Sequence, residues 1–211
     1  MERCTRVLIS DPEERKGKWR ELMPEAKEVF LELGCGKGRF TAETAAQNPQ
    51  ALYIAVERVP DAMVIAMERV CAQELHNVFF VDGDVAQLPL FFAPGEVDRI
   101  YINFCDPWPS NRHAKRRLTH PDCLLRYRQV LAEAGEIHFK TDNRDLFEWS
   151  LFQFPRVGFG VSEVTRDLHA DGIHGVMTDY EEKFHNLGTP INRCVGTMGP
   201  LPEVPEPPAE E

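Results

Sequence analysis

The fold is decided by the stretch VFLELGCGKG at positions 29–38. Its first half is an apolar run around one acid, the pattern of a buried strand, and its second half carries glycine at every other position. Glycine lets the backbone turn tightly and approach a ligand, because no Cβ stands in the way. A strand that ends in such a turn and leads into a helix is typical of nucleotide-binding α/β sheets.

Short apolar runs and helical patterns alternate along the rest of the chain. A helix is predicted to open at Pro60, another to run from an N-cap at Thr119 to Gly135, and a third to span 143–154. This alternation predicts an α/β protein with a doubly wound, mostly parallel, seven-stranded sheet, Rossmann-like, with helices on both faces. Its strands are expected at 29–33, 52–56, 78–81, 100–102, 137–140, 161–165 and 191–195.

Two polar ends flank one expected domain, residues 28–198. The chain has 211 residues, of which 43% are hydrophobic, enough for one sizeable core. Residues 1–27 are predicted to form an arm or a loose helix. Residues 199–211 hold five prolines, four glutamates and no base, which predicts a disordered acidic tail.

The cysteines and the hydropathy pattern point to a reducing compartment. Six scattered cysteines show no zinc-ligand spacing, so we expect neither a disulfide framework nor a metal site. No apolar run is long enough to span a bilayer, and the charged N-terminus does not look like a signal peptide. The expected location is therefore the cytoplasm, without membrane attachment.

A basic segment stands out in an acidic chain. The net charge is -10, yet positions 110–128 carry six Lys or Arg and a single acid. Such a patch suits a localised contact with nucleic acid, although a solvated basic loop would have the same composition.

The glycine-rich turn and the acid at the end of the next strand favour a nucleotide cofactor. Gly34 and Gly36 would approach the ligand, and Glu57 is placed to accept the two ribose hydroxyls. A dinucleotide motif would need a third glycine where Arg39 stands. The pattern therefore fits S-adenosylmethionine better than NAD, and an NAD-dependent dehydrogenase is disfavoured.

Two further carboxylates belong to the same predicted cofactor site. Glu32 precedes the glycines, and Asp84 follows the third strand, where it could contact an adenine amino group. A helix cap or a turn carboxylate is the ordinary structural explanation for each of these acids, Glu57 included.

The stretch NFCDPWPS at 103–110 supplies a second set of chemical groups. Asp106 offers a carboxylate, and Trp108, stiffened by a proline on either side, could stack on an unpaired base or close the sheet edge as a core residue. The cations that follow are expected to contact RNA phosphates: Arg112, Lys115, Arg116 and Arg117.

Five motifs in order make the chain resemble the bacterial tRNA (guanine-N7-)-methyltransferase family, a class I S-adenosylmethionine-dependent group. The resemblance covers residues 29–198. It implies methyl transfer to N7 of a guanine in tRNA, guanine 46 of the variable loop, giving 7-methylguanosine. The motifs are ELGCGKG at 32–38, NFCDPWP at 103–109, RHAKRRL at 112–118, FKTDN at 139–143 and TDYEEKF at 178–184.

The same resemblance implies roles for single residues. It assigns cofactor contacts to Glu32, Glu57, Asp84 and Asp106, and gives Asp106 the catalytic role as well. Two departures are Ser110, where the family commonly has Lys, and Asp179, where it commonly has Glu. The implied substrate contacts are Ser110, Asp142, Thr178, Asp179, Tyr180 and Glu181.

The chemistry at guanine N7 needs alignment more than a base, because this nitrogen carries a lone pair and no proton. A carboxylate at Asp106 would favour the positive charge that moves onto the purine. A class I methyltransferase acting on another RNA or on a protein, and a non-enzymatic RNA-binding protein on the same scaffold, remain as alternatives. The sequence leaves open whether the protein is a monomer or a homodimer.

Overall fold

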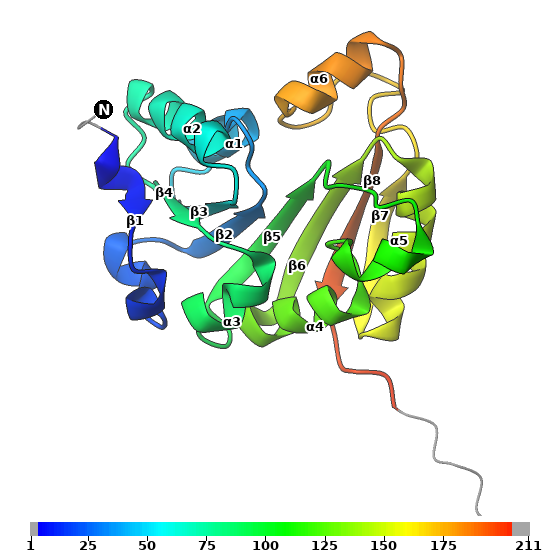
Figure 1. Cartoon of the computed structure of the whole chain (residues 1–211), viewed down its shortest axis with the longest axis horizontal. Helices are drawn as coiled ribbons and strands as arrows, with labels where there is room; N and C mark the ends of the chain where they lie inside the picture. Colours follow the sequence, from blue (N-terminus) through cyan, green and yellow to red (C-terminus); the bar gives the residue numbers. More distant parts are fainter. Residues whose placement is uncertain (1–3, 204–211) are drawn as a thin grey trace, which may run out of the picture.

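The computed structural model describes residues 4–203, and their strands form one eight-stranded sheet in the order β1-β4-β3-β2-β5-β6-β8-β7 (Figure 1). This confirms the predicted α/β fold, with one strand more than the seven expected. The strands are β1 (Leu8–Ile9), β2 (Glu28–Leu33), β3 (Ala51–Glu57), β4 (Val78–Asp82), β5 (Val97–Asn103), β6 (Leu131–Thr141), β7 (Phe159–Thr165) and β8 (Asn192–Met198).

The order of the strands fixes where a ligand can bind. Strands β1 to β6 pair in parallel, whereas β8 runs antiparallel to both β6 and β7. From β2 the chain proceeds outward to β3 and β4, then returns to β5 on the other side of β2. The order in which strands are added to the sheet therefore reverses between β2 and β5. A crevice outside the carboxyl ends of these two strands is the expected binding position.

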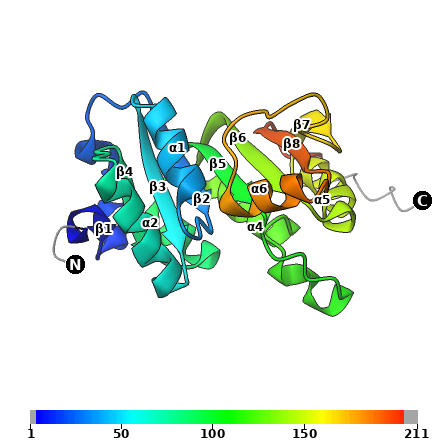
Figure 2. The same ribbon diagram turned by 90° about the horizontal axis from the view of Figure 1, so that it is seen from above.

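Helices cover both faces because the buried strands alternate their side chains. Phe30 packs on one side with α1 and α2, and its neighbour Leu31 packs on the other with α3, α4 and α5. The helix α6 lies instead above the carboxyl ends of β5 and β6 (Figures 1 and 2). The helices are α1 (Arg39–Gln47), α2 (Pro60–Ala72), α3 (Leu88–Phe91), α4 (Pro121–Val130), α5 (Arg144–Arg156) and α6 (Asp179–Asn186).

The N-terminal segment packs against the body of the protein, where the sequence had predicted an arm or a loose helix. Its strand β1 pairs with β4 and adds the eighth strand to the sheet. Trp19 is fully buried, stacks on Phe92 with ring centroids 5.0 Å apart, and donates its indole N–H to the carbonyl of Phe91 at 2.8 Å. One isolated tryptophan gives no periodic signal, which is why the sequence did not reveal this packing.

The predicted boundaries of α4 are wrong at both ends. Its N-cap is His120, whose ring nitrogen accepts from the backbone of Asp122 at 3.1 Å. Thr119 is buried, with its hydroxyl 2.7 Å from that of Ser150. Strand β6 begins directly after α4, so Gly135 lies inside a strand and does not terminate the helix.

At the C-terminal end, residues 200–203 are exposed and irregular. The remainder of the predicted tail, 204–211, lies outside the described residues. In the part of the chain that the structure describes, no helix combines the length and the apolar character needed to cross a membrane.

Candidate active site

The glycine-rich turn after β2 opens onto free space. Gly34 and Gly36 have φ angles of 77° and 54°, a left-handed conformation that favours glycine, and a Cβ built on either would meet nothing within 4 Å. Gly38 differs, because a Cβ there would lie 2.5 Å from the Cβ of Ala66 on α2. The first two glycines therefore shape a cradle for a ligand, and the third allows α1 and α2 to pack closely.

Glu57, at the end of β3, holds this turn. One of its oxygens accepts from the backbone N–H of Gly36 at 2.8 Å, and the other accepts from those of Arg58 and Val59 at 2.8 and 2.9 Å. The carboxylate thus lies next to the open glycine cradle, as the predicted ribose contact requires.

Glu32 lies beneath the turn and is only 1% exposed. Its carboxylate accepts from the hydroxyls of Thr41 at 2.6 Å and Tyr53 at 3.0 Å, and from the amide of Asn103 at 3.3 Å. Burial raises the pKa of Glu32, while these hydrogen bonds oppose the shift. In this structure Glu32 forms the floor of the cradle and ties β2, β3, β5 and α1 together.

Asp84 follows β4 and is half exposed. Its carboxylate accepts from the backbone N–H of Ala86 at 2.9 Å, which caps a short 3-10 helix, and from the guanidinium of Arg58 at 3.0 Å. The capping explanation therefore holds for Asp84, which follows β4 just as Glu57 ends the neighbouring strand β3.

The loop after β5 carries Asp106 in an unusual backbone. Phe104 and Trp108 have φ angles of 54° and 43°, positions that cost on the order of 1–3 kcal/mol for residues with a Cβ. The carboxylates of Asp106 and Asp142 form no hydrogen bond with any other described residue. Because β5 and β6 pair in parallel, these two free acids emerge from neighbouring strand ends.

The two cysteines beside the site are poorly suited to act as nucleophiles, because their surroundings disfavour the thiolate. Burial raises the pKa of Cys105, next to Asp106, to about 12, and burial together with Glu32 and Glu57 raises the pKa of Cys35 well above its usual range. Both thiols stay protonated at neutral pH.

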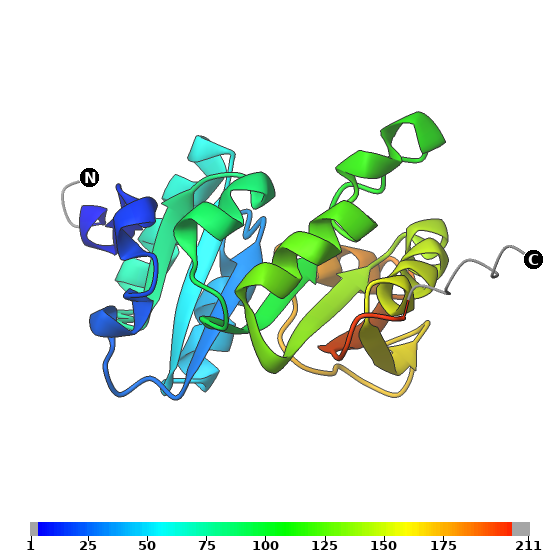
Figure 3. The same ribbon diagram turned by 90° about the horizontal axis from the view of Figure 1, so that it is seen from below.

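The basic segment projects from the body of the protein (Figure 3). Ser110 caps its 3-10 helix (Asn111–Arg116) by accepting from the N–H of Arg112 at 3.3 Å. Arg112, Lys115 and Arg116 are exposed there, and Arg116 lies over the ring of Trp108 at 4.7 Å from its centroid. Trp108 is therefore a partly buried residue that contacts His113 and Arg116, and not a core residue at the sheet edge.

Arg117 lies apart from the other predicted phosphate contacts. It is only 6% exposed, and its guanidinium donates to carbonyls of the loop that carries Asp106. The structure thus brings three of the four cations to the surface and turns the fourth inward.

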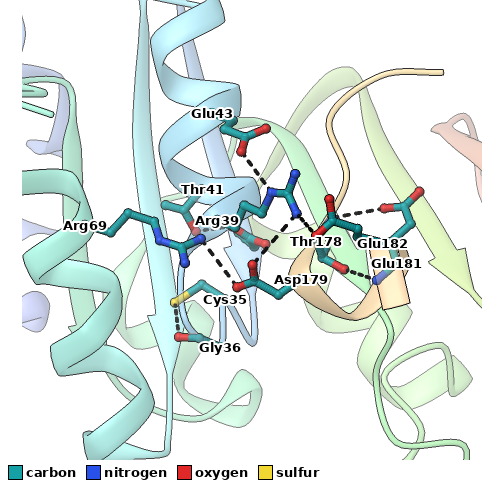
Figure 4. A network of polar contacts seen from close by, with 11 residues as sticks. Cys35, Gly36, Arg39, Thr41, Glu43, Arg69, Thr178, Asp179, Glu181 and Glu182 are labelled. Atoms are coloured by element: carbon teal, nitrogen blue, oxygen red, sulfur yellow. Dashed lines mark hydrogen bonds and ion pairs between the residues drawn. The ribbon is translucent and has the colours of Figure 1, made fainter. Parts of the chain in front are cut away.

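The start of α6 carries the remaining predicted substrate contacts. Thr178 accepts from the N–H of Glu181 at 2.9 Å, and the Glu181 side chain accepts from the N–H of Thr178 at 3.2 Å, a reciprocal capping box. Asp179 pairs with Arg69 of α2 at 3.4 Å, and Arg39 of α1 pairs with Glu182 at 2.7 Å (Figure 4). These ion pairs join α6 to α1 and α2, the two helices that pack beside the glycine turn.

Glu181 is fully buried and anchors α6 to the sheet. Lys140 of β6 donates to one of its oxygens at 2.6 Å and also to the carbonyl of Val176 at 3.0 Å. His169 lies 3.0 Å from the other oxygen. Its second ring nitrogen accepts from the N–H of His174, so the proton sits on the nitrogen that faces Glu181. Burial lowers the pKa of Lys140, and Glu181 opposes this shift.

Two aromatic rings lie close together near the site, one on α6 and one in the loop that carries Asp106. Tyr180 on α6 is 60% exposed, and its ring centroid lies 6.5 Å from that of Phe104, with the planes 31° apart. An exposed aromatic ring offers a face on which an unpaired base can stack.

Two cavities border the region. One of about 580 Å³ lies on the α1 side of the sheet, and its lining includes Asn103 and Lys140 but none of the predicted cofactor residues. A second, of about 250 Å³, is bounded by Pro107, Pro109, Arg117 and residues of α5. The second cavity therefore adjoins the loop that carries Asp106, on the side of α5.

Sequence reasoning missed Lys140, Arg39, Phe104 and the inward position of Arg117. The sequence does carry one signal for Lys140. It is a charged residue in a predicted strand, and it lies within the motif FKTDN at 139–143. The left-handed backbone of Phe104 and the orientation of Arg117 leave no mark on residue spacing.

Known proteins match this chain over most of its length. A family model described as "Putative methyltransferase" matches residues 26–194. A tRNA (guanine-N(7)-)-methyltransferase from Streptococcus suis (strain 05ZYH33) is 49% identical over 187 residues, 88% of each chain. The enzyme of the same name from Geobacillus kaustophilus (strain HTA426) is 44% identical over 194 residues, 92% of this chain and 89% of that one.

Solved structures confirm the fold. The 16S rRNA methyltransferase KamB aligns with a TM-score of 0.68 at 16% identity, covering 87% of this chain and 94% of its own. A mutant 16S rRNA (adenine(1408)-N(1))-methyltransferase from Catenulisporales acidiphilia, with its cosubstrate SAM, aligns with a TM-score of 0.63 at 12% identity, covering 92% and 93%. At this identity the likeness concerns the fold alone.

Proposed function

The chain belongs to the tRNA (guanine-N(7)-)-methyltransferase family, and from this premise we propose that it methylates N7 of guanine 46 in the variable loop of tRNA, with S-adenosylmethionine as the donor and 7-methylguanosine as the product. The observation that carries this proposal is the free carboxylate of Asp106. It lies at the end of β5, across the point of strand reversal from the glycine turn after β2.

The residues around the glycine turn fit S-adenosylmethionine. Gly34 and Gly36 leave space for a ligand, Glu57 offers oxygen atoms for the ribose hydroxyls, and Asp84 lies at the next strand end with half of its side chain exposed. When bound, the cofactor supplies an electrophilic methyl group on a sulfonium ion. Glu32 and Glu57 would hold the turn in shape, and the cradle would exclude water from the cofactor.

The role of Asp106 follows from the charge that develops on the base. Guanine N7 attacks with its own lone pair, so no proton must be removed and the site must chiefly align the two reactants. The carboxylate of Asp106 stabilises the positive charge that appears on the purine, more strongly in the transition state than before it. Asp142, on the neighbouring strand end, is placed to accept hydrogen bonds from the guanine edge.

We infer that the base enters between Phe104 and Tyr180. Phe104 precedes Asp106 by two residues, and Tyr180 is presented by α6 with 60% of its surface exposed. Stacking against both rings would place the guanine over the end of β5. Ser110, Thr178, Asp179 and Glu181 would then hold the segments on either side of the base in place.

The projecting basic segment suits the tRNA backbone. Arg112, Lys115 and Arg116 are exposed on one short helix that extends from the catalytic loop. In a protein with a net charge of -10, this segment would orient the polyanion toward the site and keep it away from the rest of the surface.

The test is methyl transfer from labelled S-adenosylmethionine to unmodified tRNA, with nucleoside analysis of the product. We expect 7-methylguanosine from the wild-type protein, none when guanine 46 is replaced by adenine, and none with Asp106→Ala. Glu133→Ala serves as the matched control, because Glu133 is an exposed acid near the amino end of β6, away from the strand ends that carry the site. Cofactor binding without transfer to tRNA would contradict the proposal and direct attention to another acceptor.

A further inference from the structure

The loop that carries Asp106 cannot hold its own shape. Two of the three residues after Asp106 are prolines, Pro107 and Pro109, which have no N–H to donate. Trp108 between them has a φ of 43°, a conformation that residues with a Cβ rarely adopt. Such a loop needs an outside partner for its carbonyl groups if Asp106 is to keep one position.

Arg117 is that partner. Its Nε donates to the carbonyls of Pro107 and Trp108 at 3.1 and 3.2 Å. Its Nη2 donates to the carbonyls of Trp108 and Pro109 at 2.9 and 3.5 Å. One planar guanidinium thus contacts three consecutive carbonyls, a pattern that the single ammonium of lysine cannot reproduce.

The guanidinium is itself fixed by the body of the protein. It lies over the ring of Trp149 on α5, 4.4 Å from the centroid, and Arg117 as a whole is 6% exposed. The chain just beyond it is anchored by Tyr127, whose hydroxyl donates to the carbonyl of Leu118 at 2.9 Å. The loop is therefore attached through Arg117 to a rigid helix. The neighbouring Arg116, by contrast, is exposed, and its guanidinium lies over the ring of Trp108 without a hydrogen bond to the carbonyls of the loop.

We propose that Arg117 is a positioning residue, which fixes the loop of Asp106 for methyl transfer and does not bind tRNA phosphates. The inference rests on the proposed catalytic role of Asp106. This role replaces the phosphate contact that the sequence suggested for Arg117. The other three cations of the basic segment keep their predicted role as phosphate contacts.

The experiment compares Arg117→Ala and Arg117→Lys with Arg116→Ala and Arg128→Ala. Arg128 is the matched control for a lost carbonyl clamp, because its guanidinium donates to the carbonyls of Val157, Gly158 and Gly199, at the opposite end of the sheet. Each variant is measured for kcat, for KM toward tRNA, for the dependence of tRNA affinity on salt, and for its melting temperature.

We expect Arg117→Ala and Arg117→Lys to lower kcat at least 100-fold, with the salt dependence of tRNA binding unchanged. Millimolar guanidinium should restore at least a tenth of the lost activity to Arg117→Ala and nothing to Arg117→Lys. Arg116→Ala should instead raise KM for tRNA and reduce the salt slope by about one. Arg128→Ala should lower the melting temperature as much as Arg117→Ala does, with kcat within threefold of wild type.

Hydrogen exchange of residues 104–112 provides a readout that does not depend on activity. We expect the amides of this segment to exchange at least tenfold faster in Arg117→Ala than in wild type, and not in Arg128→Ala. If the wild-type protein failed to methylate tRNA, the proposed function would fall while this measurement would still decide the role of Arg117. A normal kcat with a reduced salt slope, or an unchanged loop exchange rate, would overturn the proposal.

Discussion

One oxygen of Glu57 accepts from the glycine turn and the other accepts from the segment after β3, and this arrangement predicts what an isosteric change would do. In Glu57→Gln, either orientation of the amide points an NH₂ group at a backbone N–H of Gly36 or of Arg58 and Val59. The variant also loses an acceptor for the ribose. We expect S-adenosylmethionine to bind at least tenfold more weakly, a loss of at least about 1.4 kcal/mol.

Calorimetric titration with S-adenosylmethionine measures this effect directly. Glu43→Gln is the control, since Glu43 is a half-exposed acid on α1 whose partner is Arg39. Equal affinities of Glu57→Gln and wild type would remove Glu57 from the cofactor site.

His138 makes the stability of the protein depend on pH. Its burial, assisted by the guanidinium groups of Arg99 and Arg193 and opposed by Glu136, lowers its pKa from 6.5 to about 4. Between these values the unfolded chain binds more protons than the folded one, so the free energy of unfolding rises with pH and levels off above 6.5. Because one pH unit is worth about 1.4 kcal/mol, this group contributes about 3 kcal/mol above pH 6.5, and acidification to pH 4 removes it.

Urea unfolding at pH 7.0, 5.5 and 4.5 tests this expectation. Wild type should lose stability steadily on acidification, and His138→Gln, whose amide can still reach Glu136, should lose about 2 kcal/mol less over the same range. Parallel curves for the two proteins would show that other groups cause the acid sensitivity.

At the scale of single elements, α6 is held by charge more than by apolar packing. Lys140→Met would leave the carboxylate of Glu181 buried without its cation, and breaking such a pair costs about 3–5 kcal/mol. Because the loss concerns one helix, we expect it as faster hydrogen exchange across residues 176–186 and a lower kcat on tRNA.

The exposed face of the same helix provides the comparison. Lys183→Met removes an exposed lysine and should change stability by less than about 0.5 kcal/mol. A double variant, Lys140→Met with Glu181→Gln, should recover part of the loss, because the second change removes the unpaired charge. If the double variant were as damaged as Lys140→Met, the ion pair would not be the anchor of α6.

The motifs predicted the strands and helices around the site well, but they did not predict which side chains contact one another there. The strands and the turn at Gly34 followed from apolar runs and glycine spacing, which are local properties of the chain. That Glu181 is fully buried could not be read in the same way, because its partners Lys140 and His169 are distant in sequence and reach it only after β6 and the preceding loop are in place. The reciprocal cap between Thr178 and Glu181, by contrast, joins residues only three positions apart.

At the scale of the whole molecule, we propose that the folded unit includes the N-terminal segment. Trp19→Ala would empty a fully buried site, a loss of about 3–5 kcal/mol, and would break the hydrogen bond to Phe91. Thermal unfolding should show one transition at a lower temperature, and a chain that starts at residue 28 should be destabilised further. A truncated protein with an unchanged melting temperature would restore the domain boundary expected from the sequence.

The sequence by itself determined the class of fold, the family and the edge of the sheet that carries the chemistry, because apolar periodicity, glycine spacing and motif order act within a few residues of each other. Only the tertiary structure decided which charged side chains face solvent. Arg116 and Arg117 are neighbours in a basic run, yet one projects outward and the other is buried over Trp149. That difference arises because a buried guanidinium is stable only where distant segments bring carbonyl groups and an aromatic ring to it.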